Sequence, residues 1–173
     1  MQAITIKIRI NPTDSALLKQ LALEYIQVVN RLTEEAEQNG AFPKVTTKDV
    51  TSNLPSAVLN QAIRDAKSVY RKGKKLGKRP ILKKPVYYVN NQNYTIGDST
   101  ISFPIIIDGK VKKTSFPATI TERDRELLNN AKFGLMRVVV RSSKWYAQVS
   151  LEVPTEQESF STVEMGVDLG LKL

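Results

Sequence analysis

The feature that most constrains the fold is a lone strand-like segment at the start of the chain. Ile4, Ile6, Ile8 and Ile10 alternate with polar residues, which is the period-two pattern of a half-buried β-strand. Strand patterns return only from about residue 85, after two segments of helical periodicity. A single strand is not stable alone, so we expect it to pair with the late strands.

Two helices are expected between these strands, each with an apolar face at helical spacing. The first begins where Thr13 or Asp14 can cap it, and it ends at Asn39-Gly40. The second opens at Asn53-Leu54-Pro55, because proline is favoured in the first turn of a helix. Gly73 is expected to end the second helix.

The rest of the sequence predicts about six short strands. Asp108-Gly109 and Ser142-Ser143 are each expected to turn a tight hairpin. In the strand after the second turn, Trp145 shares a face with core residues, whereas Tyr146 points the other way and is the better candidate for a ligand contact. The predicted fold class is α+β. Tight turns and alternating strands favour a small β-barrel, interrupted by a helical insertion after its first strand.

The composition excludes several kinds of chemistry. The 173-residue chain has no cysteine and no histidine, so disulfides, Cys/His zinc sites and His-dependent nucleophiles are ruled out within it. Any metal must be held by oxygen ligands, which favours magnesium or manganese. No apolar run approaches the roughly 20 residues of a membrane helix. The N-terminus lacks a continuous apolar stretch, so we expect a cytoplasmic protein without a membrane partner.

A cluster of basic residues indicates a polyanionic partner. The net charge is +9, and residues 71–84 hold eight basic side chains and no acid. Gly73 and Gly77 are expected to make this stretch flexible. On the preceding helix, Asn60, Arg64 and Lys67 line one polar face that continues to Arg71. Phosphate backbones attract such a surface by counterion release.

Residues 87–94 allow two interpretations. Their tyrosines and amides suit stacking on unpaired bases and contacts to base edges. They equally suit a polar strand–loop–strand whose tyrosines belong to the barrel.

The end of the sequence carries one carboxylate in a distinctive setting. In residues 163–173 a short apolar strand delivers Asp168 between Gly166 and Gly170, which can hold a carboxylate close to a metal ion or a phosphate. Such a site needs further carboxylates. We therefore interpret the chain as the front part of a larger nucleic-acid enzyme, with residues 155–162 as a linker.

Four segments in order resemble the TnpB family of transposon-encoded RNA-guided DNA endonucleases and the related type V CRISPR effectors. These are the helix over 54–72, the loop containing Lys78-Arg79-Pro80, the strand over 144–153 and the motif over 165–171. The resemblance implies an oligonucleotide-binding (wedge) barrel with a helical recognition insertion, followed by a RuvC nuclease domain of RNase H-like fold. The implied segments are 1–11 (first barrel strand), 12–76 (recognition insertion), 77–154 (rest of the barrel), 155–162 (linker) and 163–173 (start of a truncated nuclease domain).

The resemblance also implies roles and partners. Asp168 falls on the family's first catalytic aspartate, a ligand of Mg²⁺ in a two-metal mechanism. One carboxylate cannot act alone, so this chain by itself is not expected to cleave, and a missing C-terminal half or a second chain would complete the site. The implied partners are guide RNA and target duplex DNA in a bacterial or archaeal cell, at the nucleoid when DNA is bound. Ser56, Asn60 and Gln61 would face the target duplex, where amides suit adenine edges. The candidate nucleic-acid-binding residues are Ser56, Asn60, Gln61, Arg64, Lys67, Arg71, Lys72, Lys74, Lys75, Lys78, Arg79, Lys83, Lys84 and Tyr146.

Two alternatives stay open. One is a module that binds RNA or DNA without cutting it and acts in regulation. The other is the start of an actin-like ATPase or sugar kinase, because Gly166-Val-Asp-Leu-Gly170 resembles the first phosphate motif of those proteins. That motif is normally followed by small hydroxyl residues, whereas Leu171-Lys172-Leu173 follows here.

Overall fold

The computed structural model describes residues 1–154, and its elements confirm the predicted α+β class. The predicted linker, the segment 163–173 and Asp168 lie outside the described residues. The elements are β1 (Gln2–Ile10), α1 (Ser15–Gln38), α2 (Ser56–Leu76), β2 (Val86–Val89), β3 (Thr95–Ile96), β4 (Thr100–Ile107), β5 (Lys110–Thr119), α3 (Glu122–Asn129), β6 (Lys132–Arg141) and β7 (Lys144–Val153).

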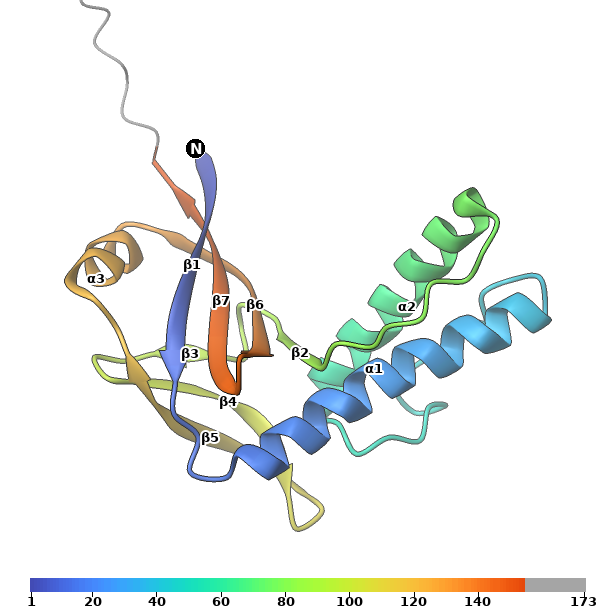
Figure 1. Cartoon of the computed structure of the whole chain (residues 1–173), viewed down its shortest axis with the longest axis horizontal. Helices are drawn as coiled ribbons and strands as arrows, with labels where there is room; N and C mark the ends of the chain where they lie inside the picture. Colours follow the sequence, from blue (N-terminus) through green and yellow to red (C-terminus); the bar gives the residue numbers. More distant parts are fainter. Residues whose placement is uncertain (155–173) are drawn as a thin grey trace, which may run out of the picture.

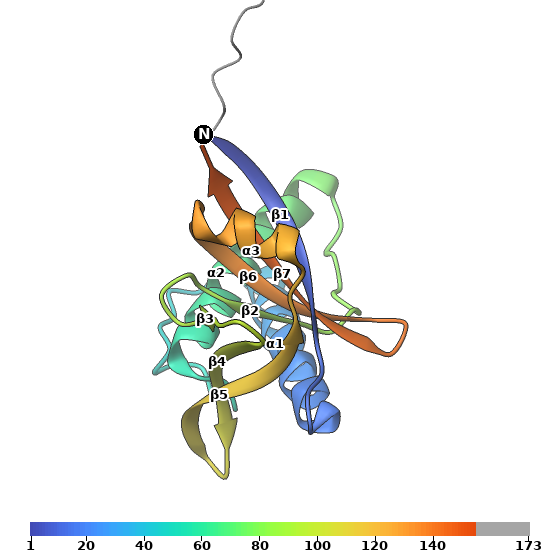
Figure 2. The same ribbon diagram turned by 90° about the vertical axis from the view of Figure 1, so that its left-hand side faces the viewer.

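The strands form one curled, antiparallel sheet with the order β2-β6-β7-β1-β5-β4-β3, a half-barrel in shape (Figures 1 and 2). The first strand pairs with the last along its whole length, from Gln2 opposite Val153 to Ile10 opposite Trp145. Its pairing with β5 covers only Arg9 and Ile10. The prediction that the first strand pairs with late strands is therefore confirmed, and β1 joins the two parts of the sheet.

Side chains and one loop connect the two ends of the half-barrel. The edge strands β2 and β3 are joined by residues 90–94. Tyr94 at the end of this loop donates its hydroxyl to Gly134 O on β6 (2.9 Å), and its ring stacks on Phe133 at 6.0 Å. Tyr87 on β2 donates its hydroxyl to Pro104 O on β4 (2.8 Å). Tyr87 and Tyr94 thus belong to the barrel interior, as the second interpretation of residues 87–94 proposed.

The turns and the core face of β7 agree with the sequence. Asp108 and Gly109 both adopt positive φ, and so do Ser142 and Ser143, as two-residue hairpin turns require. Trp145 is 5% exposed and lies in the core, whereas Tyr146 is half-buried on the outer face.

Helices α1 and α2 pack side by side and project from the sheet as an arm (Figure 1). The helical arm comprises residues 15–85, including the return segment 77–85 that leads from α2 back to β2. Asp14 caps α1, because its side chain accepts from Leu17 N at 2.8 Å. The arm shares one hydrophobic core with the sheet. At the joint, Tyr88 of β2 packs against the buried Tyr25 of α1, with ring centroids 5.5 Å apart.

The prediction that Gly73 ends the second helix is wrong. The helix continues to Leu76 and ends at Gly77, which adopts the left-handed conformation with φ 67°. Gly73 is buried because the return segment crosses it: a Cβ there would lie 2.8 Å from Pro80 Cδ. This glycine permits close packing of the return segment against the helix.

Helix α3 was not predicted. It lies between β5 and β6 and buries none of its residues. A helix without a buried face does not need apolar residues at helical spacing, so that pattern is weak in its sequence. Its start nevertheless carries a capping box, in which Thr121 and Asp124 bond reciprocally through side chains and backbone. That local signal in the sequence would have found it.

Candidate nucleic-acid interface

The basic face of α2 is exposed because the opposite face is buried against α1. Val58, Leu59, Ala62, Ile63 and Ala66 of α2 are all buried. Residues on the other side of the helix therefore face solvent. Eleven of the thirteen candidates on α2 and the return segment are exposed, namely Ser56, Asn60, Arg64, Lys67, Arg71, Lys72, Lys74, Lys75, Lys78, Lys83 and Lys84.

Gln61 differs from its neighbours because it takes part in a hydrogen-bond network inside the arm. Its side-chain amide donates to Asp65 Oδ1 at 3.0 Å, while the buried Tyr25 donates to Asp65 Oδ2 at 2.6 Å. Burial, followed by the nearby Asp65 carboxylate, raises the pKa of Tyr25 far above its ordinary value. Gln61 thus contributes to packing between the helices, and Asn60 is the more available amide for a base edge.

Arg79 also has partners within the arm. Its guanidinium lies 3.0 Å from Glu37 and 3.5 Å from Glu34, both on α1. Asn30 holds the same segment by two bonds to the main chain of Leu82, donating to its carbonyl at 2.9 Å and accepting from its N–H at 2.8 Å. These contacts fix the return segment along α1, so its lysines project from a defined backbone.

A second basic surface lies on the outer face of the sheet and was missed by the sequence-based list. The sheet patch consists of exposed residues on three neighbouring strands: Lys7, Arg9, Arg137, Arg141 and Lys144. Among β1, β6 and β7, the one acidic residue is Glu152, which pairs with Lys132 at 3.5 Å near one end. The signal was present in the alternation of β1, whose isoleucines point inward and therefore place Lys7 and Arg9 outward.

Tyr146 lies within the sheet patch, where Lys7 covers one face of its ring. The Lys7 ammonium is 4.2 Å from the ring centroid. A base that stacks on this face must displace Lys7, whereas the lysine itself is well placed to contact a phosphate.

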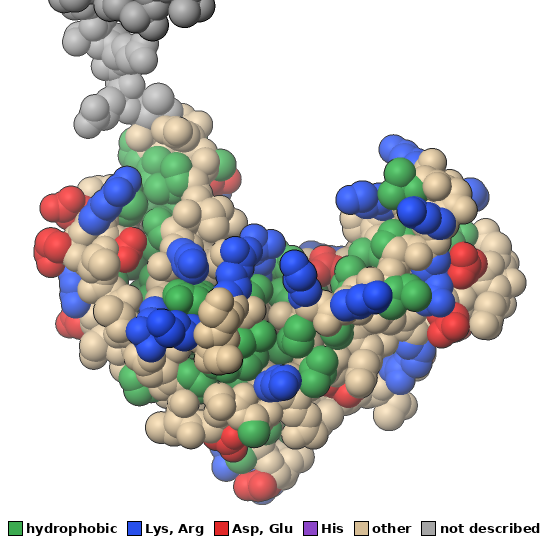
Figure 3. All heavy atoms as spheres, in the orientation of Figure 1, with side chains coloured by type: hydrophobic (Ala, Val, Ile, Leu, Met, Phe, Trp, Pro, Cys, Tyr) green, Lys and Arg blue, Asp and Glu red, His purple; other side chains and the backbone are tan. Residues whose placement is uncertain are grey.

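The sheet patch and the helical arm border one hollow. Register pairs place Lys7, Gln148, Arg137 and Tyr88 in a row across four strands, and Tyr88 packs on α1 where the arm begins. Figure 1 shows α1 below α2, which leaves the upper side of α2 along the hollow. In the space-filling view, lysine and arginine side chains are spread over this concave surface (Figure 3). Phosphates placed there would meet cations from both walls.

Residues 1–154 contain no group of three or more acidic, histidine or cysteine side chains that could hold a metal ion. The predicted ligand Asp168 lies outside this part of the chain, so no described residue tests the expected magnesium site. Within the same described residues, no helix has the length and apolarity needed to cross a membrane.

No family model matches the chain, and no curated protein does.

Proposed function

We propose that this chain binds nucleic acid across the hollow between the helical arm and the sheet patch. The observation that carries the proposal is the charge on both walls: α2 and the return segment supply cations on one side, and β1, β6 and β7 on the other. Counterion release from a phosphate backbone is the main driving force that such a surface offers. The overall charge of +9 adds a long-range attraction to polyanions.

More specifically, we propose the guide-RNA- and target-DNA-binding portion of an RNA-guided DNA endonuclease of the TnpB type. Two considerations support this proposal: the four motifs quoted above, and a curled sheet whose first strand is followed by a two-helix insertion. In this scheme the exposed Asn60 and Ser56 lie one helical turn apart and contact the target duplex. Asp168 would be one of the ligands of Mg²⁺, a role that rests on the resemblance alone.

The test compares three triple glutamine variants that each remove three positive charges. One changes Arg64, Lys67 and Arg71 on the arm. A second changes Lys7, Arg9 and Arg137 on the sheet patch. The matched control changes Lys110, Lys112 and Lys113, which lie on the β4–β5 hairpin away from the hollow (Figure 1).

Fluorescence anisotropy with a hairpin RNA and with a DNA duplex measures the outcome. The arm and sheet variants are expected to lose affinity, and the control is expected to lose much less. The loss should be nearly independent of base sequence, because phosphate contacts carry no sequence information. Equal losses in all three variants would mean that only net charge matters, and would contradict binding in the hollow.

A further inference from the structure

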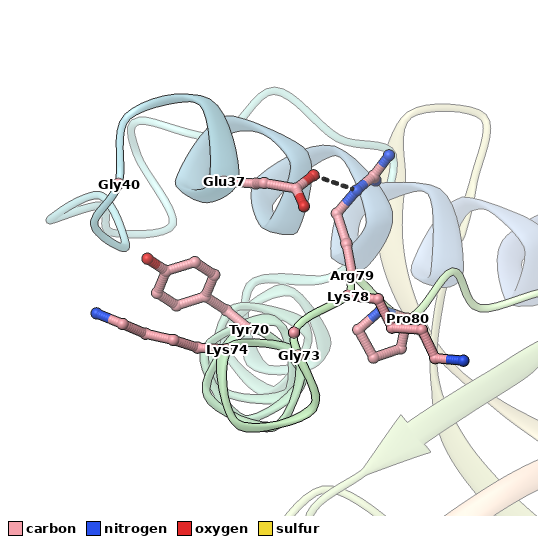
Figure 4. A pocket seen from close by; sticks show the side chains of 9 residues that line it. Glu37, Gly40, Tyr70, Gly73, Lys74, Lys78, Arg79 and Pro80 are labelled. Carbon is pink, nitrogen blue, oxygen red and sulfur yellow. Dashed lines mark ion pairs between the residues drawn. The ribbon is translucent and has the colours of Figure 1, made fainter.

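The helical arm contains a pocket at its outer end that the basic surface does not explain. The pocket has a volume of about 240 Å³ and lies between the C-terminal ends of α1 and α2 (Figure 4). Tyr70 forms an aromatic wall, and Pro80 of the return segment lies against Gly73. Gly40 and Gly77 leave space by having no side chains. Sites for drug-sized ligands measure roughly 300–1,000 Å³, so this pocket suits one flat ring system.

The charged groups of the pocket are one carboxylate, one guanidinium and two lysines. Glu37 lines it, and both helices end beside it, at the negative end of each helix dipole. Lys74 and Lys78 line its rim, and Figure 4 shows them directed away from the cavity on opposite sides. An uncharged ligand that carries N–H donors fits the interior. Negatively charged groups attached to that ligand on either side can lie against the two lysines.

The ion pair in the pocket offers both hydrogen-bonding roles. The Glu37 carboxylate forms an ion pair with Arg79, with 3.0 Å between Oε2 and Nε, and keeps lone pairs for further donors. The Arg79 side chain is 21% exposed; Nη1 donates to Asn30 O at 3.4 Å and Nη2 pairs with Glu34, which leaves N–H groups of the guanidinium for an acceptor. Guanine has adjacent N–H donors on one edge beside a carbonyl acceptor, which matches a carboxylate next to a guanidinium.

We infer that this pocket receives a single unpaired nucleobase, preferentially guanine, from the strand that the arm binds. The base stacks on Tyr70 and places its polar edge against Glu37 and Arg79. The phosphates on either side of the base lie against Lys74 and Lys78. This inference rests on the proposed nucleic-acid binding, and it adds a base-specific site to a surface that otherwise contacts phosphates.

The experiment compares a fully paired RNA hairpin with the same hairpin carrying one bulged guanosine. Anisotropy gives the affinity of the wild type, Tyr70→Leu and Tyr70→Phe for each RNA. Leucine removes the ring but keeps an apolar side chain beside Phe42, whose ring centroid lies 6.2 Å from that of Tyr70. Phenylalanine keeps the ring and is the matched control. Thermal melts verify that both variants are folded.

The wild type and Tyr70→Phe are expected to bind the bulged hairpin roughly 5- to 150-fold more tightly than the paired one, the contribution of one base–aromatic stack. Tyr70→Leu should lose this preference and bind the paired hairpin as the wild type does. A 6-thioguanosine at the bulge should crosslink on irradiation to a peptide containing residues of the pocket.

A preference that persists in Tyr70→Leu, or crosslinks that map only to the sheet, would overturn the pocket assignment. Equal wild-type affinity for both hairpins would also overturn it, while leaving the proposed function intact. No binding to either hairpin would overturn both the assignment and the proposed function.

Discussion

Trp145 and Tyr146 are adjacent in β7 but face opposite sides of the sheet, so truncating each one tests the assignment of the two faces. Trp145 is 5% exposed and lies in the pairing register between Ile10 of β1 and Val140 of β6. Its replacement by alanine leaves a cavity where two strands pack against the core. The expected loss in the free energy of unfolding is about 3–5 kcal/mol.

Tyr146→Ala removes a ring of similar size from the outer face, where it is half-buried under Lys7. The expected loss is below about 1 kcal/mol, the value of an exposed cation–π contact. Urea unfolding at neutral pH, followed by circular dichroism, measures both variants against the wild type. If Tyr146→Ala proves the more destabilising change, the two faces of β7 are inverted and the sheet patch does not exist as described.

Two further predictions concern the arm and the barrel. Asn30→Ala removes both side-chain hydrogen bonds to the main chain of Leu82. The free energy of unfolding should fall by about 1–3 kcal/mol, and hydrogen exchange at the Leu82 amide should become faster. Unchanged exchange would mean that other contacts hold the return segment. Burial raises the pKa of Tyr94 from 10.0 to about 12. The unfolded chain therefore ionises this phenol at a lower pH than the native protein does. The contribution of the neutral phenol to the free energy of unfolding is fully present below pH 10 and is lost as the pH rises toward 12. Urea unfolding across this range should show a shallower decline for Tyr94→Phe than for the wild type, and parallel declines would exclude a contribution from Tyr94.

Patterns repeated over many residues predicted the elements well. The isoleucine alternation in β1, the helical periodicity in α1 and α2, and the two hairpin turns all correspond to what the structure contains. Each of these signals depends on local geometry that neighbouring residues impose on one another.

The misread roles of Gly73 and Arg79 depend on how the return segment folds back on the helices. Gly73 resembles a helix terminator in the sequence, but its real partner is Pro80, which crosses the helix. The ion pairs of Arg79 with Glu34 and Glu37 could not be distinguished from a free phosphate-binding arginine for the same reason.

Of the two basic surfaces in the candidate interface, the sequence analysis predicted the one on the helical arm and missed the sheet patch. The basic run on α2 and the return segment is contiguous in the sequence, so its charge could be counted directly. The sheet patch includes β1, which is more than a hundred residues from β6 and β7 in the sequence, and only strand pairing places Lys7 and Arg137 on either side of Gln148. The pocket at Tyr70 likewise requires the ends of two helices to meet.

The salt dependence of binding tests the central claim most directly. For duplex DNA, log affinity falls with log salt by about 0.9 for each phosphate contact that the protein makes. Replacing Arg64, Lys67 and Arg71 with glutamine should flatten this slope by up to about 2.7 if all three contact phosphates. The Asn60→Ala variant is expected to change sequence preference and leave the slope unchanged. A triple variant that binds with the wild-type slope would show that these side chains do not contact phosphates, and would contradict nucleic-acid binding in the hollow.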